Sequence, residues 1–113
     1  MVATFSTKAL AYFRDNYPQF RRVGHYSFRE VRDGNRRLRS DLLSFRDEYG
    51  LFGLNLPVKN SQTRPEDVAY LKSKGLWISL WFVQDAEKAR EYRSAGADAF
   101  VTDYVSVVRK GLR

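Results

Sequence analysis

The chain has 113 residues, no cysteine and a formal net charge of +7. Its length is that of one domain and falls well short of the ~250 residues of a closed (β/α)8 barrel. The 43% hydrophobic and 15% aromatic content argues against a disordered chain. The lack of cysteine excludes disulfides, thiolate nucleophiles and cysteine zinc sites. Residues 1–10 contain no long apolar run, so we expect no signal peptide or membrane span and a cytoplasmic protein, unless a targeting sequence is missing.

Short apolar runs alternate with amphipathic segments along the chain, and Gly or Pro residues separate them. The expected strands span residues 2–5, 22–26, 51–56, 77–83 and 99–102. The expected helices span residues 7–16, 40–49, 85–95 and 104–110. A further helix starts at Thr63 and Glu66, which have the spacing of a capping box, and ends before Gly75, a residue suited to the left-handed position after a helix.

Five strand–helix units predict an α/β fold with right-handed crossovers. Residues 77–83 are apolar on both faces, as expected of a buried parallel strand, and Trp77 is expected in the core. The units fit either an open, doubly wound parallel sheet or a partial (β/α)8 barrel, and periodicity alone does not choose between them. A partial barrel exposes two strand edges and its inner face. We therefore expect a homodimer or a strand-swapped assembly through those edges.

Arginine is concentrated in one stretch of the sequence. Only Glu30 and Asp33 oppose this basic cluster, which consists of Arg21, Arg22, Arg29, Arg32, Arg36, Arg37 and Arg39. Such a cluster can attract phosphate groups, or it can be a solvated helix face with its loops. No nucleic-acid motif accompanies it, and its aromatic residues are not interleaved as a stacking platform, so we predict no nucleic-acid partner.

Candidate catalytic groups are few. The single histidine, His25, lies near a strand end and is expected to be a structural residue. Two carboxylates are expected at strand ends: Asp85 as a helix N-cap, and Asp103 as a cap of the last helix or a brace of its loop. These two carboxylates are too few for a metal site on this chain alone. The residues therefore predict neither a catalytic group nor a metal ligand.

Several motifs, taken in order, resemble the C-terminal part of the glycerophosphodiester phosphodiesterase family, whose members are (β/α)8 barrels. The matching segments are Gly-Leu-Asn-Leu-Pro at 53–57, Thr-x-Pro-Glu at 63–66, Trp-Phe-Val-Gln at 81–84 and Gly-Ala-Asp-Ala-Phe-Val-Thr-Asp at 96–103. Weaker matches are Thr-Phe-Ser at 4–6 and residues 18–26, whereas residues 27–40 have no counterpart. Three positions depart from the family pattern: Phe82 replaces Thr, Gln84 replaces Asn and Ala99 replaces Gly.

The resemblance implies a fold of the last four or five barrel units over residues 1–113 as one domain. It also implies the family's reaction, the hydrolysis of glycerophosphodiesters in lipid metabolism with a divalent cation, Ca²⁺ or Mg²⁺. The family's catalytic His-Arg-Gly, its metal-binding Glu-x-Asp and its second His have no counterpart in this sequence. In the family, aromatic residues at the positions of Trp81 and Phe5 line the substrate cleft, although both residues could equally fill the core.

The sequence thus predicts a truncated phosphodiesterase-like chain that binds a small phosphodiester and is inert alone. Two alternatives are a module that binds a phosphate-containing ligand through strand-end loops and the basic cluster, and a half-barrel that assembles with a second copy.

Overall fold

The computed structural model describes residues 1–26, 36–59 and 62–112 and contains five strands and five helices in strict alternation. The strands are β1 (Val2–Thr4), β2 (Arg22–His25), β3 (Gly53–Pro57), β4 (Trp77–Trp81) and β5 (Ala99–Val101). The helices are α1 (Thr7–Asn16), α2 (Arg36–Tyr49), α3 (Pro65–Ser73), α4 (Ala86–Ser94) and α5 (Val105–Gly111). The expected α/β architecture is therefore confirmed.

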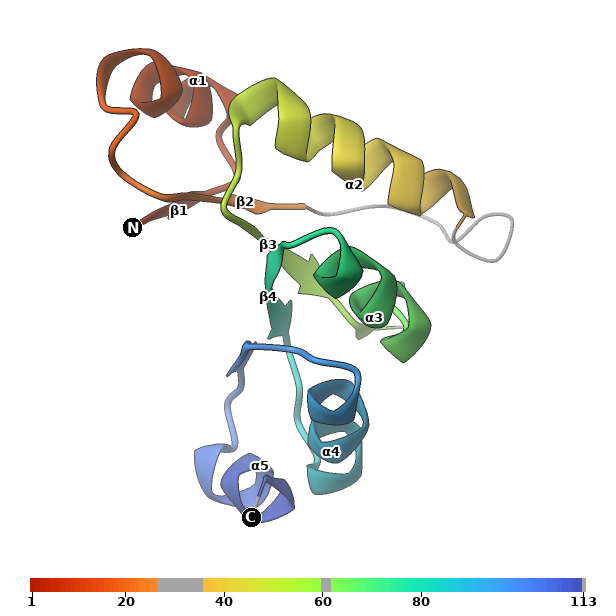
Figure 1. The fold of residues 1–113 in the computed structure, drawn as a ribbon. Coiled ribbons are helices and arrows are strands. Elements are labelled where there is room, and N and C mark those ends of the chain that lie inside the picture. The colour runs from red at the N-terminus through yellow and green to blue at the C-terminus, as the bar shows by residue number, and fades with distance from the viewer. Residues whose placement is uncertain (27–35, 60–61, 113) are drawn as a thin grey trace.

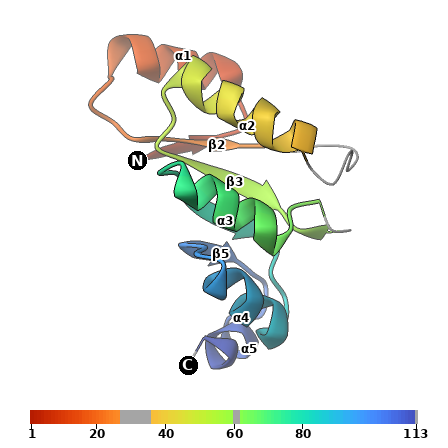
Figure 2. The same ribbon diagram turned by 45° about the vertical axis from the view of Figure 1, so that its right-hand side comes forward.

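The strand order distinguishes the two architectures that the sequence left open. The sheet runs β1-β2-β3-β4-β5, and every neighbouring pair is parallel. Right-handed crossovers in this order carry all helices to one side of the sheet, whereas a doubly wound sheet reverses its order at a switch point. The helices accordingly fan around one side of the strands, from α1 and α2 through α3 to α4 and α5 (Figures 1 and 2). The fold is an arc of a barrel.

The helix-covered face holds the main core. Alternate residues of the two central strands are fully buried there, namely Leu54 and Leu56 of β3 with Ile78 and Leu80 of β4. Side chains from all five described helices complete this cluster, including Leu10, Leu42, Val68, Leu71, Ala89, Tyr92 and Val108. Each buried leucine stabilises the fold by about 2 kcal/mol relative to exposure. The amphipathic character expected of these helical segments is therefore confirmed.

The opposite side of the sheet, which we call the inner face, is defined by the strand register. Val23, Gly53 and Trp77 are cross-strand partners there, and His25, Asn55 and Ser79 form the next row. Successive residues of a strand point to opposite faces, so these rows alternate with the core leucines. Trp77 is only partly buried and stacks on Phe52 with the ring centroids 6.1 Å apart. The expectation that Trp77 is a core residue is therefore wrong, because it projects from the face that none of the described helices covers.

The helix boundaries follow local hydrogen bonds, and two differ from expectation. Asp85 caps α4 as expected, since its carboxylate accepts from the backbone N of Lys88 at 2.8 Å. The cap of α3 is Arg64 rather than Thr63, because the Asp67 carboxylate accepts from the Arg64 backbone N at 2.9 Å. Gly75 has φ +83° after α3, as expected. Helix α2 begins at Arg36, earlier than expected.

Exposed apolar residues gather at the two ends of the arc, which end in the unpaired edges of β1 and β5. In the part of the chain that the structure describes, the exposed large hydrophobic residues come from two segments only. They are Met1, Phe5, Tyr12, Tyr17 and Phe20 near β1 and α1, and Phe82, Val101, Tyr104, Val105 and Val107 near β5 and α5. Among the described helices, no segment has both the length and the apolar character needed to cross a bilayer.

Candidate functional site

Three aromatic rings meet at the carboxyl ends of the strands. Phe5 follows β1, His25 ends β2 and Trp81 ends β4. The ring centroid of Phe5 lies 4.7 Å from that of His25 and 6.3 Å from that of Trp81. The structure therefore brings together the two residues, Trp81 and Phe5, that the sequence places in a substrate pocket. Phe5 remains 59% exposed, so it does not simply fill the core.

A polar pair lies beneath these rings, on the inner face. Asn55 of β3 is only 7% exposed, and its side-chain Nδ2 lies 3.0 Å from Nδ1 of His25. The other amide atom of Asn55, Oδ1, is buried without a hydrogen-bond partner among the described residues, and so is Nε1 of Trp81. Native proteins leave few buried polar atoms unpaired. Among the described residues, no group uses the hydrogen-bonding capacity of these two atoms.

The electrostatic state of His25 follows from its surroundings. Partial burial lowers the pKa of His25 from the ordinary value of 6.5, because a charged imidazole loses hydration there. The ring is therefore neutral at pH 7. With Nδ1 accepting from the Asn55 amide, the remaining proton lies on Nε2, which becomes a hydrogen-bond donor. His25 is thus a neutral, oriented ring rather than a cation.

The loop that follows β5 is held by a side chain from the loop that follows β4. Oε1 of Gln84 accepts from the Thr102 hydroxyl at 2.8 Å and from the Asp103 backbone N at 3.0 Å, and its Nε2 donates to the Asp103 carboxylate at 3.0 Å. Asp103 therefore braces a loop, and α5 has no side-chain cap. Gln84 departs from the family pattern, and its longer side chain makes this clamp.

Two hollows flank the aromatic rings. The lysine hollow, of about 500 Å³, borders Trp81 and is lined by Val58, Lys59, Trp81, Phe82, Gln84, Asp85 and Lys88. The acidic hollow, of about 470 Å³, borders His25 and is lined by Phe5, Thr7, His25, Tyr26, Asp41, Ser44, Phe45, Glu48 and Tyr49. Sequence reasoning did not identify Lys59 and Lys88, although both follow strand ends. The lysine hollow can attract an anion.

The strand-end residues do not fit a divalent cation. Within residues 1–26, 36–59 and 62–112, no group of three His, Asp or Glu side chains is arranged to hold a metal ion. Asp85 is engaged as the cap of α4, and Asp103 is engaged by Gln84. A metal site of the kind that the family resemblance implies is therefore not formed by these side chains together.

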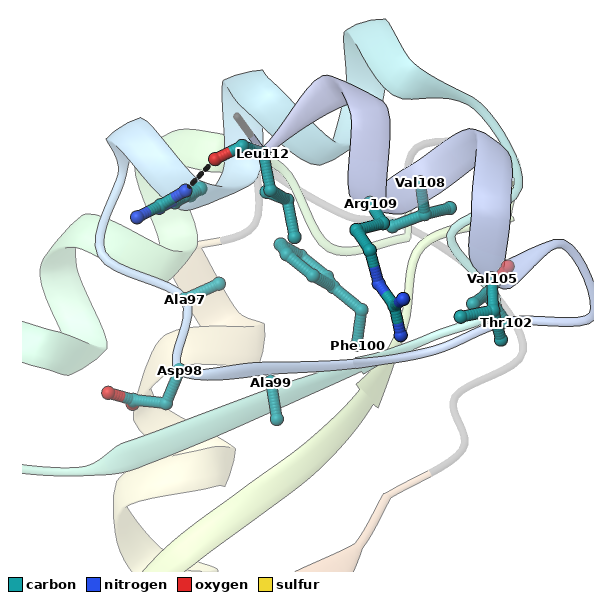
Figure 3. Close-up of a pocket in the computed structure, with 10 residues that line it drawn as sticks. Ala97, Asp98, Ala99, Phe100, Thr102, Val105, Val108, Arg109 and Leu112 are labelled. Carbon is teal, nitrogen blue, oxygen red and sulfur yellow. Dashed lines mark hydrogen bonds between the residues drawn. The ribbon is translucent and has the colours of Figure 1, made fainter.

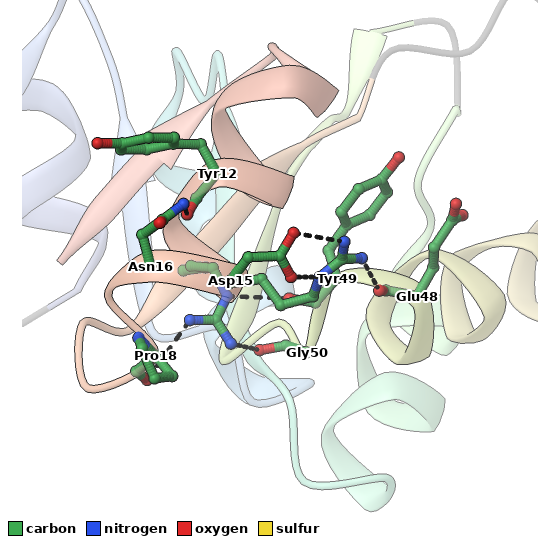
Figure 4. Close-up of polar contacts among 9 residues, drawn as sticks. Tyr12, Asp15, Asn16, Pro18, Glu48, Tyr49 and Gly50 are labelled. Atoms are coloured by element: carbon green, nitrogen blue, oxygen red, sulfur yellow. Dashed lines mark hydrogen bonds and ion pairs between the residues drawn. The ribbon is translucent and has the colours of Figure 1, made fainter.

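The described side chains of the basic cluster make contacts within the fold. Arg22 is 8% exposed at the start of β2 and donates to the backbone oxygens of Tyr49, Gly50 and Phe20. Figure 4 shows Pro18, Tyr49 and Gly50 around this contact. The Arg21 guanidinium lies 4.5 Å from the centroid of Phe52.

Arg39, on α2, pairs with Asp67 at 2.8 Å. Arg21 and Arg22 lie at the amino end of β2, opposite to Phe5 and Trp81, so they do not join the strand-end site. The cluster's Arg29 and Arg32 lie outside the described residues, as do the side chains of Arg36 and Arg37.

Solved structures share this fold. A phosphodiesterase from Oleispira antarctica, solved in complex with the product sn-glycerol-3-phosphate, matches 97% of this chain at 18% identity with a TM-score of 0.76. Glycerophosphodiester phosphodiesterases from Parabacteroides distasonis and Thermotoga maritima match 96% and 98% of it, at 21% and 18% identity, each with a TM-score of 0.68.

The match covers only part of those proteins. This chain spans 40% of the Oleispira and Parabacteroides chains and 46% of the Thermotoga chain. No family model matches the sequence, and no curated protein matches it significantly. Strand order, helix placement and superposition agree with the resemblance seen in the sequence, and the chain has the fold of part of a glycerophosphodiester phosphodiesterase barrel.

Proposed function

We propose that the carboxyl ends of the strands bind a phosphate ester of glycerol, and that this chain forms one wall of the site without hydrolysing the ligand alone. The observation that carries this proposal is the convergence of Phe5, His25 and Trp81 beside the lysine hollow. Aromatic rings offer contact area to the carbon atoms of such a ligand, and the ammonium groups of Lys59 and Lys88 attract its phosphate. The complex of the Oleispira phosphodiesterase with sn-glycerol-3-phosphate supports this class of ligand.

The chemistry of the residues present supports the proposal that this chain does not hydrolyse the ligand alone. Hydrolysis of a phosphodiester uses a general acid, a general base and, in the family that this chain resembles, a divalent cation. The sequence has one histidine, and its Nδ1 is engaged with Asn55. Asp85 and Asp103, the carboxylates expected at strand ends, are engaged by backbone and side-chain groups. Catalysis would therefore need groups from another chain or segment.

Binding and hydrolysis are tested separately on the purified chain. Titration with sn-glycerol-3-phosphate, measured by isothermal titration calorimetry, should saturate in the wild type. It should weaken about tenfold or more in Trp81→Ala and in the double variant Lys59→Ala/Lys88→Ala, since each loses a principal contact. Trp77→Phe is the matched control, because Trp77 lies on the same strand and face but stacks on Phe52. Unchanged binding in both variants would refute the site.

The hydrolysis arm uses glycerophosphocholine with Ca²⁺ or Mg²⁺. We expect no turnover above the rate without protein. Robust turnover that Trp81→Ala reduces would overturn the claim that the chain is inert alone while supporting the location of the site.

A second candidate function is assembly, and the distribution of exposed apolar residues favours it. These residues lie at both open edges of the arc, and a hollow beneath α5 is lined by Phe100, Val105, Val108 and Leu112 (Figure 3). Exposed apolar patches beside unpaired strands favour association. In a homodimer, β5 of one copy would pair in parallel with β1 of the other copy. This pairing would cover the exposed apolar residues near β1 and near β5. Strand swapping is a variant of the same contact.

Sedimentation at increasing protein concentration tests the assembly. A dimer is expected in the wild type, and Val105→Asp should shift it to monomer because a charge enters the apolar contact. Arg90→Asp on the exposed side of α4 is the control. A clean monomer at high concentration would contradict this second function and leave ligand binding untouched.

A further inference from the structure

We propose that the hollow beneath α5 is a second ligand site, which binds an amphipathic carboxylate with its hydrocarbon chain inside the hollow and its head group on Arg109. This α5 hollow has a volume of about 520 Å³ and lies between β5, α5 and the last turn of α4 (Figure 3). Phe100 lines it and pairs in register with the core residue Leu80, so the hollow is on the helix-covered side of the sheet. It shares no lining residue with the lysine hollow, and the inference therefore goes beyond the proposed function.

The first argument is the apolar surface inside the α5 hollow. Phe100 on β5 and Leu112 after α5 are only partly buried, and their side chains point toward one another in Figure 3. Val105 of α5 is 54% exposed, whereas Val108, three residues later, is buried. Release of water from such walls is favourable, so a hydrocarbon chain is favoured in its place. The walls therefore select a ligand with an apolar body.

The second argument is the state of the Arg109 guanidinium. Arg109 lines the α5 hollow, and Figure 3 shows its side chain extending from α5 toward β5. None of the ion pairs among the described residues includes it. A guanidinium presents its N–H donors in a planar fork that matches the two oxygens of a carboxylate. Arg109 can therefore hold the head group of an anionic ligand.

The third argument is the charge around the hollow. Arg93, in the last turn of α4, also lines it and donates to the Leu112 carbonyl oxygen, which holds this second guanidinium in place. The described lining residues include one acid, Asp98, whose carboxylate is paired with Lys72 at 2.7 Å. Neither guanidinium is thus balanced by a described carboxylate. An anion in the hollow is attracted by both.

Charge also decides between the two occupants that the apolar walls allow. A second copy of the chain, as in the assembly proposed above, would bring a formal net charge of +7 toward the two guanidiniums. An anionic ligand is attracted by them instead. A monoanion is favoured over a phosphate dianion, because the carbonyl oxygens at the end of α5 carry partial negative charge. An amphipathic carboxylate therefore fits the walls and the charge together.

The direct test uses octanoate, which has a hydrocarbon chain and one carboxylate. NMR spectra of methyl-labelled valine and leucine residues report on Val105, Val108 and Leu112 in the α5 hollow, and on Val58 in the lysine hollow. At pH 7, octanoate should shift the signals of the α5 hollow saturably and the Val58 signals little. 1-Octanol, which has the chain without the charge, should bind about fivefold more weakly. Acetate, which has the charge without the chain, should give no saturable shift.

Substitution tests Arg109 as the anchor of the head group. Arg109→Gln removes a charge from an exposed position, and we expect octanoate affinity to fall about fivefold while 1-octanol affinity stays unchanged. Lys110→Gln is the matched control, because Lys110 is the next cation on α5, is also exposed and does not line the hollow. Its octanoate affinity should equal that of the wild type.

Several outcomes would overturn the second site. They are the lack of a saturable shift with octanoate, equal shifts at Val58, equal affinities for octanoate and 1-octanol, and equal losses in Arg109→Gln and Lys110→Gln. An octanoate affinity that falls as the protein concentration rises would show that a second copy covers the hollow instead. sn-Glycerol-3-phosphate should leave the signals of the α5 hollow unchanged, so the proposed function and the second site can each fail while the other stands.

Discussion

The two ends of the sheet use their polar groups differently. At the amino ends of the strands, Arg22 donates to four backbone oxygens at 2.9–3.5 Å. Asp98 accepts from the Ile78 backbone N at 2.8 Å and from Lys72 at 2.7 Å. At the carboxyl ends, Asn55 and Trp81 each keep a buried atom without a partner among the described residues. In (β/α)8 barrels the amino end stabilises the fold and the carboxyl end holds the ligand. In this arc the described polar groups are paired at the amino end, and two buried atoms are without a described partner at the other end.

The largest effect is expected at Arg22. Arg22→Ala removes a buried guanidinium from the Tyr49, Gly50 and Phe20 oxygens and leaves these acceptors without their donor. We expect a loss of about 3 kcal/mol in the free energy of unfolding, measured by urea denaturation. Arg90→Ala, at an exposed position, should change it by less than ~0.5 kcal/mol. Equal losses in the two variants would show that the amino end has no special role.

A smaller loss is expected at Asp98, which joins the start of β5 to β4 and α3. Asp98→Ala removes the acceptor of the Ile78 backbone N and an ion pair with a partly exposed lysine. We expect a loss of about 1–2 kcal/mol, mostly from the unpaired backbone N. Asp47→Ala is the control, because its ion pair with Arg46 is on the surface. If Asp47→Ala lowers the free energy of unfolding as much as Asp98→Ala does, the argument that the amino end of the sheet stabilises the fold is wrong.

The sequence predicted the alternation of elements because Pro18, Gly50, Gly75 and Asp85 act locally. A turn residue or a helix cap depends on its immediate neighbours in the sequence, so its effect is the same in the folded chain. The early start of α2 was missed because the arginine-rich residues before position 40 show no apolar period. The choice of a barrel arc needed the strand order, which depends on contacts between units.

The site was only partly predictable for the same reason. Trp81 and Phe5 were placed at strand ends by motif; β4 ends at Trp81 and Phe5 follows β1, and their role in a pocket stays a proposal. The Asn55–His25 bond joins residues 30 positions apart and depends on the β2–β3 register. One signal could have indicated it, since Asn55 is a polar residue between two leucines of a strand.

Removal of a buried polar side chain should cost little stability at the carboxyl end of the sheet, in contrast to Arg22→Ala at the amino end. Asn55→Leu removes a buried oxygen that has no partner among the described residues and fills the same space with carbon. We expect the free energy of unfolding to change by less than ~1 kcal/mol, in urea denaturation at pH 7, because the lost bond to His25 is offset by the removal of the unpaired atom. A loss as large as that of Arg22→Ala would mean that Asn55 is a stabilising residue, and the contrast between the two ends would fail.

The smallest effect is the pH dependence that His25 introduces at the carboxyl end. Its folded-state pKa is lowered from 6.5 by burial, so the unfolded chain binds this proton more readily than the folded chain. Stability is therefore full above pH 6.5 and falls as the pH drops below 6.5 toward the folded pKa. His25 is the single histidine of the sequence, so its ring proton signals in NMR can be followed without ambiguity. The midpoint should lie below 6.5, and His25→Gln should remove this part of the pH dependence of unfolding. A midpoint at or above 6.5 would mean that the ring is hydrated or paired with an acid. In the charged ring Nδ1 is a donor, so it could no longer accept from the Asn55 amide.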